Sequence, residues 1–249
     1  MAGECLFCHQ PVMGPQDICL SCRQALPEAK PRCMLCAEIL QPDAQHLLDE
    51  QAPIIERPSF LQLPSTQARQ ACCPACQRHP PSYDQLTVLW PYEQPLDRLM
   101  LRFKYRQDLN AGGLFLDWLE TKIQPQGHWS LVSIPAHRAR KRQRGIDPPA
   151  WIAQRLARMW QQPYQSQWLM RIKETPSQQK LSRHQRLSNP QGAFLAHPAV
   201  AGQSCLLIDD VVTTGSTLHW AAKALKAAGA QQVEALALVK VDHADARHP

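Results

Sequence analysis

Two neighbouring carboxylates and a cluster of hydroxyl side chains around one glycine lie close together near the end of the sequence. Asp209 and Asp210 follow the apolar run Cys205–Ile208 and precede the small-residue run Thr213–Thr217. A hydroxyl-rich turn that leads into a helix directs several backbone N–H groups and the positive end of the helix dipole to one point, which favours a phosphate. Gly215 would let the backbone approach that phosphate closely. The run therefore predicts a phosphate site beside two acids.

Two elements must position these residues. Cys205–Ile208 has no polar face, which is typical of a strand covered on both sides of a parallel sheet. Leu218–Ala228 is rich in alanine and predicts a helix ended by Gly229. The plainer alternative is that the acids form a turn and the hydroxyls cap this helix, but a cap needs only one such side chain. Open α/β sheets bind ligands at the carboxyl ends of their strands, so the position favours a ligand site.

The run Leu206–Thr217 resembles the ribose-phosphate signature of the type I phosphoribosyltransferases, which bind phosphoribosyl pyrophosphate (PRPP). The resemblance implies that Asp209 and Asp210 contact the ribose hydroxyls. It also implies that the 5′-phosphate is held by Thr213, Thr214, Gly215, Ser216 and Thr217.

Length and charge set broad limits. A chain of 249 residues allows one large or two ordinary domains, and its net charge of +6 favours an anionic partner, either nucleic acid or a phosphorylated small molecule. The start of the chain, Met1–Cys5, has neither a basic nor an apolar export region, and we find no uncharged apolar span of about 20 residues. We therefore expect a cytoplasmic protein without a transmembrane segment.

The cysteines are concentrated in the first part of the chain. All ten except Cys205 lie before residue 77, and most form Cys-x-x-Cys pairs, which is metal-site spacing. A pair of redox motifs is the alternative, but the segment lacks the βαβ context of thioredoxins. Four thiolates on two such knuckles complete a tetrahedral zinc site. The first predicted structural Zn²⁺ site comprises Cys5, Cys8, Cys19 and Cys22.

The second predicted zinc site is interrupted by a long insert. Its pairs are separated by residues 37–72, which are rich in proline and glutamine and predict a partly helical or poorly ordered loop. Cys72 and Cys73 are adjacent, so either could be the third ligand, although Cys73 has the Cys-x-x-Cys spacing with Cys76. Because this part of the chain has little core of its own, chelation should unfold it before the remainder. The expected ligands are Cys33, Cys36, Cys73 and Cys76.

The composition changes at Pro80–Ser82, which predicts a domain boundary. We expect a double zinc-ribbon module over residues 1–80, an α/β domain over 81–243 and a loose tail over 244–249. Strands alternating with helices predict a mostly parallel sheet with helices on both faces. The expected strands are Leu86–Trp90, Leu131–Ile134, Trp168–Ile172, Cys205–Ile208 and Val233–Val239, and the expected helices before the phosphate turn are Pro95–Arg106, Ala111–Lys122 and Pro149–Trp160.

Two polar segments follow predicted strands. The first, Pro135–Gly145, holds five cations within seven positions and predicts an anion clamp for pyrophosphate, with a nucleic-acid backbone as the alternative. The second, Lys173–Gly192, is too long and polar for a routine connection and predicts either a lid or a plain surface loop. The candidate pyrophosphate contacts are Lys104, His137, Arg138, Arg140 and Arg144, and the candidate lid residues are Gln178, Arg183 and Arg186.

The chain resembles the ComF/GntX proteins in a series of features that follow one another in the same order. They are the cysteine-pair module, Phe103–Tyr105, the Pro135–Gly145 loop, the segment from Thr175 to Phe194 and the Asp209–Thr217 run. That resemblance covers nearly the whole chain. It implies a double zinc ribbon followed by a type I phosphoribosyltransferase domain, and a role in natural transformation, DNA uptake or the use of DNA as a nutrient. The chain departs from the family pattern at Gly145–Asp147, where Gly-Phe-Asn followed by Gln is usual, and in the insert before Cys73.

Two functions remain open on these residues. An enzyme of this kind would displace pyrophosphate from Mg²⁺-bound PRPP with a nitrogen nucleophile, mainly by positioning and charge stabilisation. No residue is assigned as the base. The alternative is a protein that binds PRPP or a nucleotide as a signal and also binds single-stranded DNA or the DNA-uptake machinery. The aromatic residues that could stack on bases have core-like spacing and are expected to be buried: Trp90, Tyr92, Phe103 and Tyr105.

Overall fold

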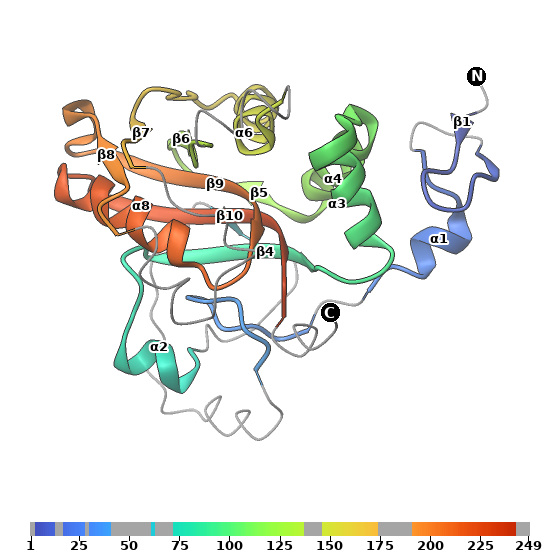
Figure 1. Ribbon diagram of the computed structural model, residues 1–249, viewed down its shortest axis with the longest axis horizontal. Coiled ribbons are helices and arrows are strands. Elements are labelled where there is room, and N and C mark those ends of the chain that lie inside the picture. Colours follow the sequence, from blue (N-terminus) through green and yellow to red (C-terminus); the bar gives the residue numbers. More distant parts are fainter. Residues whose placement is uncertain are drawn as a thin grey trace.

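The centre of the protein is a four-stranded parallel sheet (Figure 1). The computed structural model describes residues 3–12, 17–27, 30–40, 61–62, 72–136, 146–173 and 191–242. The strand order is β4-β10-β9-β6, and all three neighbouring pairs are parallel. These strands are almost continuously apolar and buried, as expected for a sheet covered on both faces. Their bounds are β4 Gln85–Pro91, β6 Ser130–Ser133, β9 Ser204–Val212 and β10 Gln232–Lys240.

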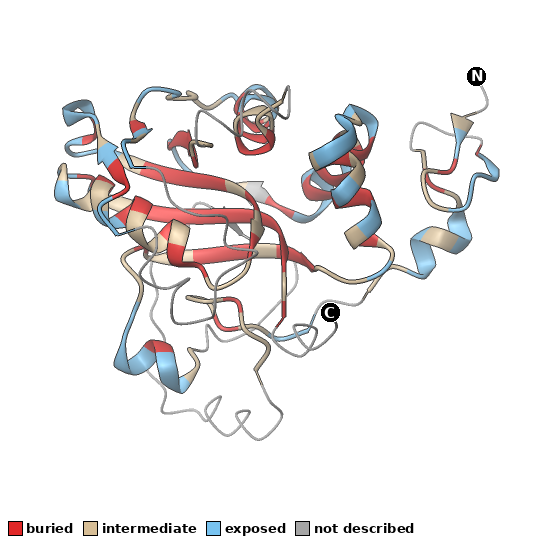
Figure 2. Ribbon diagram, viewed as in Figure 1, coloured by how far each residue is buried: buried red, intermediate tan, exposed pale blue. Residues whose placement is uncertain are grey.

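Helices cover both faces of this sheet, as predicted. Leu206 and Ile208 of β9 belong to one hydrophobic cluster, together with residues of α3 (Leu96–Arg106), α4 (Leu109–Lys122) and α6 (Pro148–Met159). Cys205 and Leu207 belong to a second cluster, with residues of α8 (Ser216–Ala227). Figure 2 shows the buried strands between partly exposed helices. Alternating side chains of one strand therefore hold helices to opposite faces.

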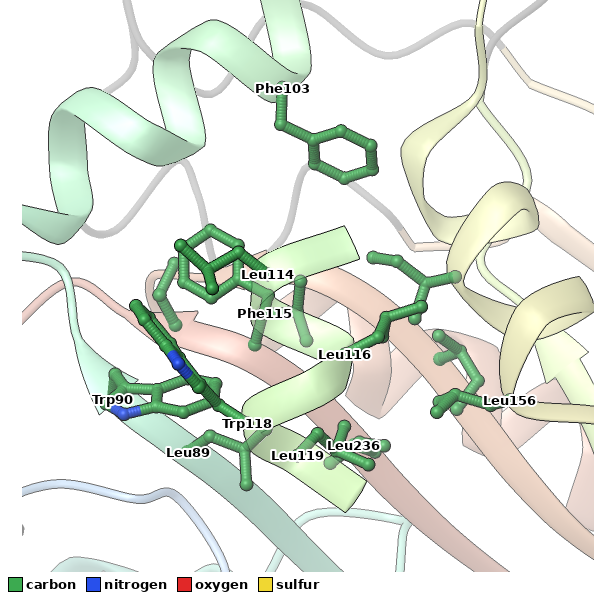
Figure 3. Packing of buried hydrophobic residues seen from close by; sticks show 14 of the residues in the cluster. Leu89, Trp90, Phe103, Leu114, Phe115, Leu116, Trp118, Leu119, Leu156 and Leu236 are labelled. Atoms are coloured by element: carbon green, nitrogen blue, oxygen red, sulfur yellow. The ribbon is translucent and has the colours of Figure 1, made fainter. Parts of the chain in front are cut away.

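Aromatic side chains fill the core beneath α3 and α4 (Figure 3). The rings of Trp90 and Trp118 lie 5.7 Å apart in a T-shaped arrangement, and Phe115 lies 5.6 Å from Trp90. Because such contacts stabilise beyond simple burial, they fix α4 over β4. The rings of Phe103 and Trp151, 5.2 Å apart, join α3 to α6 in the same way.

The remaining described elements are short. β1 (Gly3–Glu4) pairs antiparallel with β2 (Pro11–Val12), and β3 (Leu61–Gln62) pairs with β5 (Gln124–Pro125). α1 (Leu20–Gln24) and α2 (Pro74–Arg78) each begin directly after a cysteine. A 3₁₀ turn spans Pro198–Val200. Within the described ranges, no helix has the length and apolar character needed to cross a membrane.

Two expectations about strands need correction. The predicted strand Trp168–Ile172 forms as β7 (Leu169–Arg171), but it pairs antiparallel with an unpredicted strand, β8 (Phe194–Ala196), outside the parallel sheet. The predicted strand Cys205–Ile208 continues to Val212, because β10 pairs with it over its whole length. The two acids therefore lie inside β9 and do not end it. The turn that follows, Thr213–Gly215, begins where the sequence placed it and is called the phosphate turn after the role predicted for it.

On the other side of β9, pairing stops just before the acids. The last β6 pair is Ser133 with Ile208, followed by a hydrogen bond from the Ile134 N–H to the Ile208 carbonyl at 2.9 Å. From Asp209 onward, β9 has a described strand neighbour on the β10 side alone. The sheet thus opens beside the acids.

Candidate functional site

The turn between β9 and α8 brings the predicted hydroxyls together. The Thr214 Oγ1 and Ser216 Oγ atoms lie 2.9 Å apart, and the Ser216 N–H points to the same Thr214 oxygen at 3.4 Å. Gly215 has φ +74° and immediately precedes α8, whose N-cap carries no side-chain hydrogen bond. The first N–H groups of an α-helix have no acceptor within the helix, so this end of α8 is suited to an anion.

Gly215 is required for two reasons. Its left-handed φ is one that side-chain-bearing residues rarely adopt. A Cβ atom at this position would also lie 3.1 Å from the Tyr83 hydroxyl oxygen. Tyr83 is buried, and this burial raises the pKa of its hydroxyl, which stays protonated. Tyr83 therefore forms the floor beneath the turn, a role that the sequence did not indicate.

The two acids differ in their surroundings. Asp210 is buried, and its Oδ2 atom lies 3.0 Å from the Lys104 Nζ atom of α3. Asp209 accepts the Asp210 N–H at 2.9 Å, and Asp210 accepts the Val211 N–H at 2.7 Å. Burial raises the pKa of Asp209 well above its ordinary value, and the charge of Asp210 raises it further against the opposing effect of Lys104. The pair therefore favours a bound cation or sugar hydroxyls.

Lys104 thus joins the acids. We predicted it as a pyrophosphate contact; the structure places its ammonium against Asp210, so contact with a diphosphate remains a prediction. The other predicted pyrophosphate contacts, His137, Arg138, Arg140 and Arg144, lie outside the described residues. The described end of β6 leads into this segment from beside Ile208.

The predicted lid residues, Gln178, Arg183 and Arg186, also lie outside the described residues. Both ends of their segment are described. Arg171 pairs with Phe194, and the Ile172 N–H donates to the Ala193 carbonyl at 2.9 Å. The described residues on either side of the segment therefore lie next to each other at one end of the β7–β8 ladder.

The cysteines form two groups of four with the predicted membership. In each group, all four Sγ atoms lie within 4.8 Å of one another. The Cys8–Cys19 and Cys36–Cys73 sulfur distances are both 3.6 Å, close to the tetrahedral edge of about 3.8 Å that Zn–S bonds of about 2.3 Å require. Cys72 belongs to neither group, and the Cys73 sulfur completes the second one. Cys205 is a buried core residue, as expected.

In the first group, the Cys5 thiol is biased toward the form that binds a metal. Burial acts to raise the pKa of the Cys5 thiol, but hydrogen bonds from the backbone at Cys19, Cys8 and Phe7 outweigh it and lower the pKa to about 6. The thiolate is the form that binds zinc. The four-sulfur geometry of both groups suits the eight cysteines to hold two structural zinc ions, which would supply cross-links and no reaction step.

The two clusters contact different parts of the protein. The first lies beside α3 and α4, where Arg102 Nη1 donates to the Leu6 carbonyl at 2.6 Å and Phe7 stacks on Trp118. Near the second, the Leu86 N–H of β4 donates to the Met34 carbonyl at 2.9 Å. The first cluster is therefore attached to α3 and α4, and the second to β4.

A pocket of about 400 Å³ lies between the first cluster and α3. Leu6, Phe7 and Leu99 line it together with Arg98 and Arg106. Across the described part of the chain, no carboxylate pairs with either of these arginines. The pocket also corrects one expectation: Tyr105, predicted to be buried, lines it and is 50% exposed. Of the other three aromatic residues, Trp90 and Phe103 are buried as predicted, and Tyr92 is only partly buried.

Comparisons with known proteins agree with this arrangement. Residues 155–248 match the family model described as phosphoribosyl transferase domain. Competence protein F of Haemophilus influenzae is 24% identical over 248 residues, which cover 95% of this chain and 96% of that protein. DNA utilization protein YhgH of Salmonella typhi is 30% identical over 175 residues (68% and 77%), and competence protein ComFC of Bacillus subtilis is 30% identical over 156 residues (61% and 62%). With its two four-cysteine groups ahead of a phosphoribosyltransferase sheet, the chain belongs to the ComF/GntX family.

Proposed function

We propose that the chain binds PRPP, or a closely related ribose 5-phosphate, at the turn between β9 and α8. The observation that carries the proposal is the left-handed Gly215, which holds the Thr214 and Ser216 hydroxyls 2.9 Å apart at the start of α8. A phosphate at this position would meet hydroxyl donors and backbone N–H groups together. Thr213 and Thr217 complete the proposed 5′-phosphate site.

Asp209 and Asp210 are the proposed ligands of the ribose hydroxyls. They precede the phosphate turn in the same strand and lie where the sheet opens next to β6. Mg²⁺ would accompany PRPP and neutralise its diphosphate. Because Lys104 already faces Asp210, a bound diphosphate would compete with that carboxylate for the ammonium group. The arginines of residues 137–145 are the further proposed diphosphate ligands.

The reaction that such a site supports is phosphoribosyl transfer. The bond between ribose C1 and the pyrophosphate oxygen breaks, a bond from C1 to a nitrogen nucleophile forms, and pyrophosphate leaves with the electron pair of the broken bond. The chain's contribution would be to hold the ribose and its charged groups in position. A nucleobase-like compound is the proposed acceptor, and use of DNA or DNA uptake is the proposed process, as the names of the relatives suggest. A cytoplasmic location belongs to the proposal, because a reducing compartment keeps cysteine pairs free to bind metal.

Pyrophosphate release tests the reaction. Purified protein is incubated with PRPP, Mg²⁺ and each of a panel of nucleobases, beside the Asp210→Asn variant. Base-dependent release that the variant lacks supports transfer. Binding of PRPP by titration calorimetry without release for any base would leave a ligand-binding protein and exclude transfer to those bases.

The pocket beside the first cysteine cluster favours a second function, the binding of single-stranded nucleic acid. It combines an apolar floor, a half-exposed tyrosine and two arginines whose charges face no described carboxylate. Bases stack on aromatic side chains while cations contact the phosphates. Relatives named for competence and DNA utilization make this ligand the natural one to test.

A further inference from the structure

A buried ammonium group connects the second cysteine cluster to the phosphate turn. Lys240 is the last residue of β10, and its side chain is 1% exposed. Its Nζ atom lies 2.6 Å from Glu38 Oε1, 2.9 Å from the Thr213 carbonyl oxygen and 3.3 Å from the Val241 carbonyl oxygen. The three acceptors match the three N–H donors of an ammonium group. A charge at this depth is tolerated because it is paired and hydrogen-bonded, so removing one partner should disturb the others.

Thr213 is the residue at which the phosphate turn begins. It follows β9 directly and precedes Thr214 and Gly215, whose conformations place the hydroxyls. The neighbouring residue Val212 is fixed through its carbonyl, which accepts the Val241 N–H at 2.9 Å. Lys240 therefore anchors the first peptide of the turn, while Gly215 sets its far end.

Glu38 belongs to the knuckle that carries two cysteines of the second cluster. The Cys33 N–H donates to the Glu38 carbonyl at 2.8 Å, and the Ala37 N–H donates to the Cys33 carbonyl at 2.8 Å. A metal held by Cys33 and Cys36 would fix this short loop and with it the Glu38 carboxylate. The position of Glu38, and through Lys240 that of Thr213, thus depends on the knuckle.

Further contacts join the same two regions. Arg32 forms a bidentate ion pair with Asp242, at 2.6 and 2.8 Å, and also donates to the Ala37 carbonyl at 2.7 Å. Tyr83 packs in one hydrophobic cluster with Ala37 and lies beneath Gly215. By contrast, the described polar contact of the first cluster with the domain is made to Arg102 of α3. The second cluster is the one built against the phosphate turn.

We propose that Lys240 and Glu38 are positioning residues through which metal binding at the second cysteine cluster sets the conformation of the phosphate turn, whereas the first cluster has no such effect. For ligand affinity, this inference rests on the proposed function. Its conformational part does not, because the turn can be followed without ligand.

Matched single-cysteine variants test the difference between the clusters. Cys36→Ser and Cys8→Ser each disable one metal site, which zinc analysis of the purified proteins verifies. Backbone hydrogen exchange is measured for peptides covering residues 209–219, and PRPP affinity is measured with Mg²⁺ by calorimetry. Cys36→Ser should speed exchange in the turn and weaken PRPP binding about tenfold, the size of a typical coupling between sites. Cys8→Ser should change both by no more than about twofold, as expected for distant sites. Equal effects of the two variants would overturn the proposal.

Variants that keep all cysteines separate positioning from loss of the metal site. Glu38→Gln and Lys240→Met should retain wild-type zinc content yet speed exchange in residues 213–218, and Glu38→Asp should restore part of the protection. In the double variant Glu38→Gln/Lys240→Met, the effects should be far from additive, because the two residues act through one contact. Wild-type exchange in both single variants, with zinc retained, would contradict the proposal. If the wild-type protein fails to bind PRPP, the proposed function fails, while the exchange data still decide this inference.

Discussion

The Lys104 Nζ atom of α3 lies 3.0 Å from the Asp210 Oδ2 atom of β9, and both side chains are largely buried. This ion pair joins a helix on one face of the sheet to the strand that carries the proposed ribose ligands. It makes the charge of the acid pair depend on a residue about a hundred positions earlier in the chain.

Lys104→Met should destabilise the protein, because Asp210 would keep a buried charge without its partner. We expect a loss of about 3 kcal/mol in unfolding free energy at neutral pH, measured by urea denaturation. Lys104→Arg should retain most of the stability. Arg106→Met, at the exposed end of the same helix, is the matched control and should cost little. A loss of equal size in the control would argue against the ion pair as the cause.

Asp209→Asn should stabilise the protein while it abolishes PRPP binding. Because the folded-state pKa of Asp209 is raised above its ordinary value of 3.8, its contribution to stability is present at low pH and is lost as the pH rises through the folded-state pKa. At neutral pH the substitution should therefore raise the unfolding free energy by about 1 kcal/mol.

Thermal unfolding of this variant from pH 4 to pH 8 checks the sign. The difference from the wild-type protein should be smallest at pH 4 and grow with pH. The same substitution type at an exposed acid, Glu120→Gln, should change the pH dependence much less, because that charge acts mainly on Asp117 at the surface. If the variant were less stable than the wild-type protein at pH 8, the buried charge of Asp209 could not be the destabilising group.

Gly215→Ala should cost about 1–3 kcal/mol, because alanine resists a φ of +74° and its Cβ would press on Tyr83. Adding Tyr83→Phe should recover only the part that comes from the contact. Gly113→Ala in α4 is the control; a Cβ there meets nothing within 4 Å, so the helix should gain stability. The same loss of stability at both glycines would show that the geometry of the turn is not the cause of the loss.

Zinc content should distinguish two adjacent cysteines. The wild-type protein should hold two zinc ions, Cys73→Ser should lose one, and Cys72→Ser should lose none, because only Cys73 lies in a four-sulfur group. Elemental analysis of the purified variants measures this directly. The reverse result, with the loss in Cys72→Ser, would mean that the ligand assignment is wrong.

Replacing Arg98 and Arg106 by alanine should weaken the binding of a short single-stranded oligonucleotide and lower its salt dependence. If each arginine meets one phosphate, the logarithmic salt slope should fall by about 0.7 per residue. Fluorescence anisotropy from 50 to 200 mM salt is the measurement, with Arg158→Ala of α6, an exposed arginine outside the pocket, as the control. An unchanged slope in the double variant would show that the oligonucleotide does not bind at this pocket.

The sequence predicted those parts of the candidate site whose structure depends on residues close together in the chain. The run from Cys205 to Thr217 indicated the strand, the turn and the helix, because burial, glycine geometry and helix capping act over a few residues. Cysteine spacing gave both four-sulfur groups, including the choice of Cys73. The parallel sheet followed from the alternation of strands and helices.

Contacts between distant segments could not be read in this way. Lys240 stands out as a cation at the end of an apolar strand, but nothing in the sequence indicates that it meets Glu38. The length of β9 depends on β10, and β7 leaves the parallel sheet because it finds its partner in β8. Tyr105 follows the periodicity of a core position but faces a pocket formed by another segment.

The β9–α8 turn is the proposed receptor of a ribose-linked phosphate. Titration of ¹⁵N-labelled protein with ribose 5-phosphate, followed by amide chemical shifts, tests it most directly. We expect the largest shifts at Gly215, Ser216 and Thr217, at the start of α8, and their loss in the Gly215→Ala variant. Saturable shifts confined to other residues, or no shifts at millimolar ligand, would contradict the account.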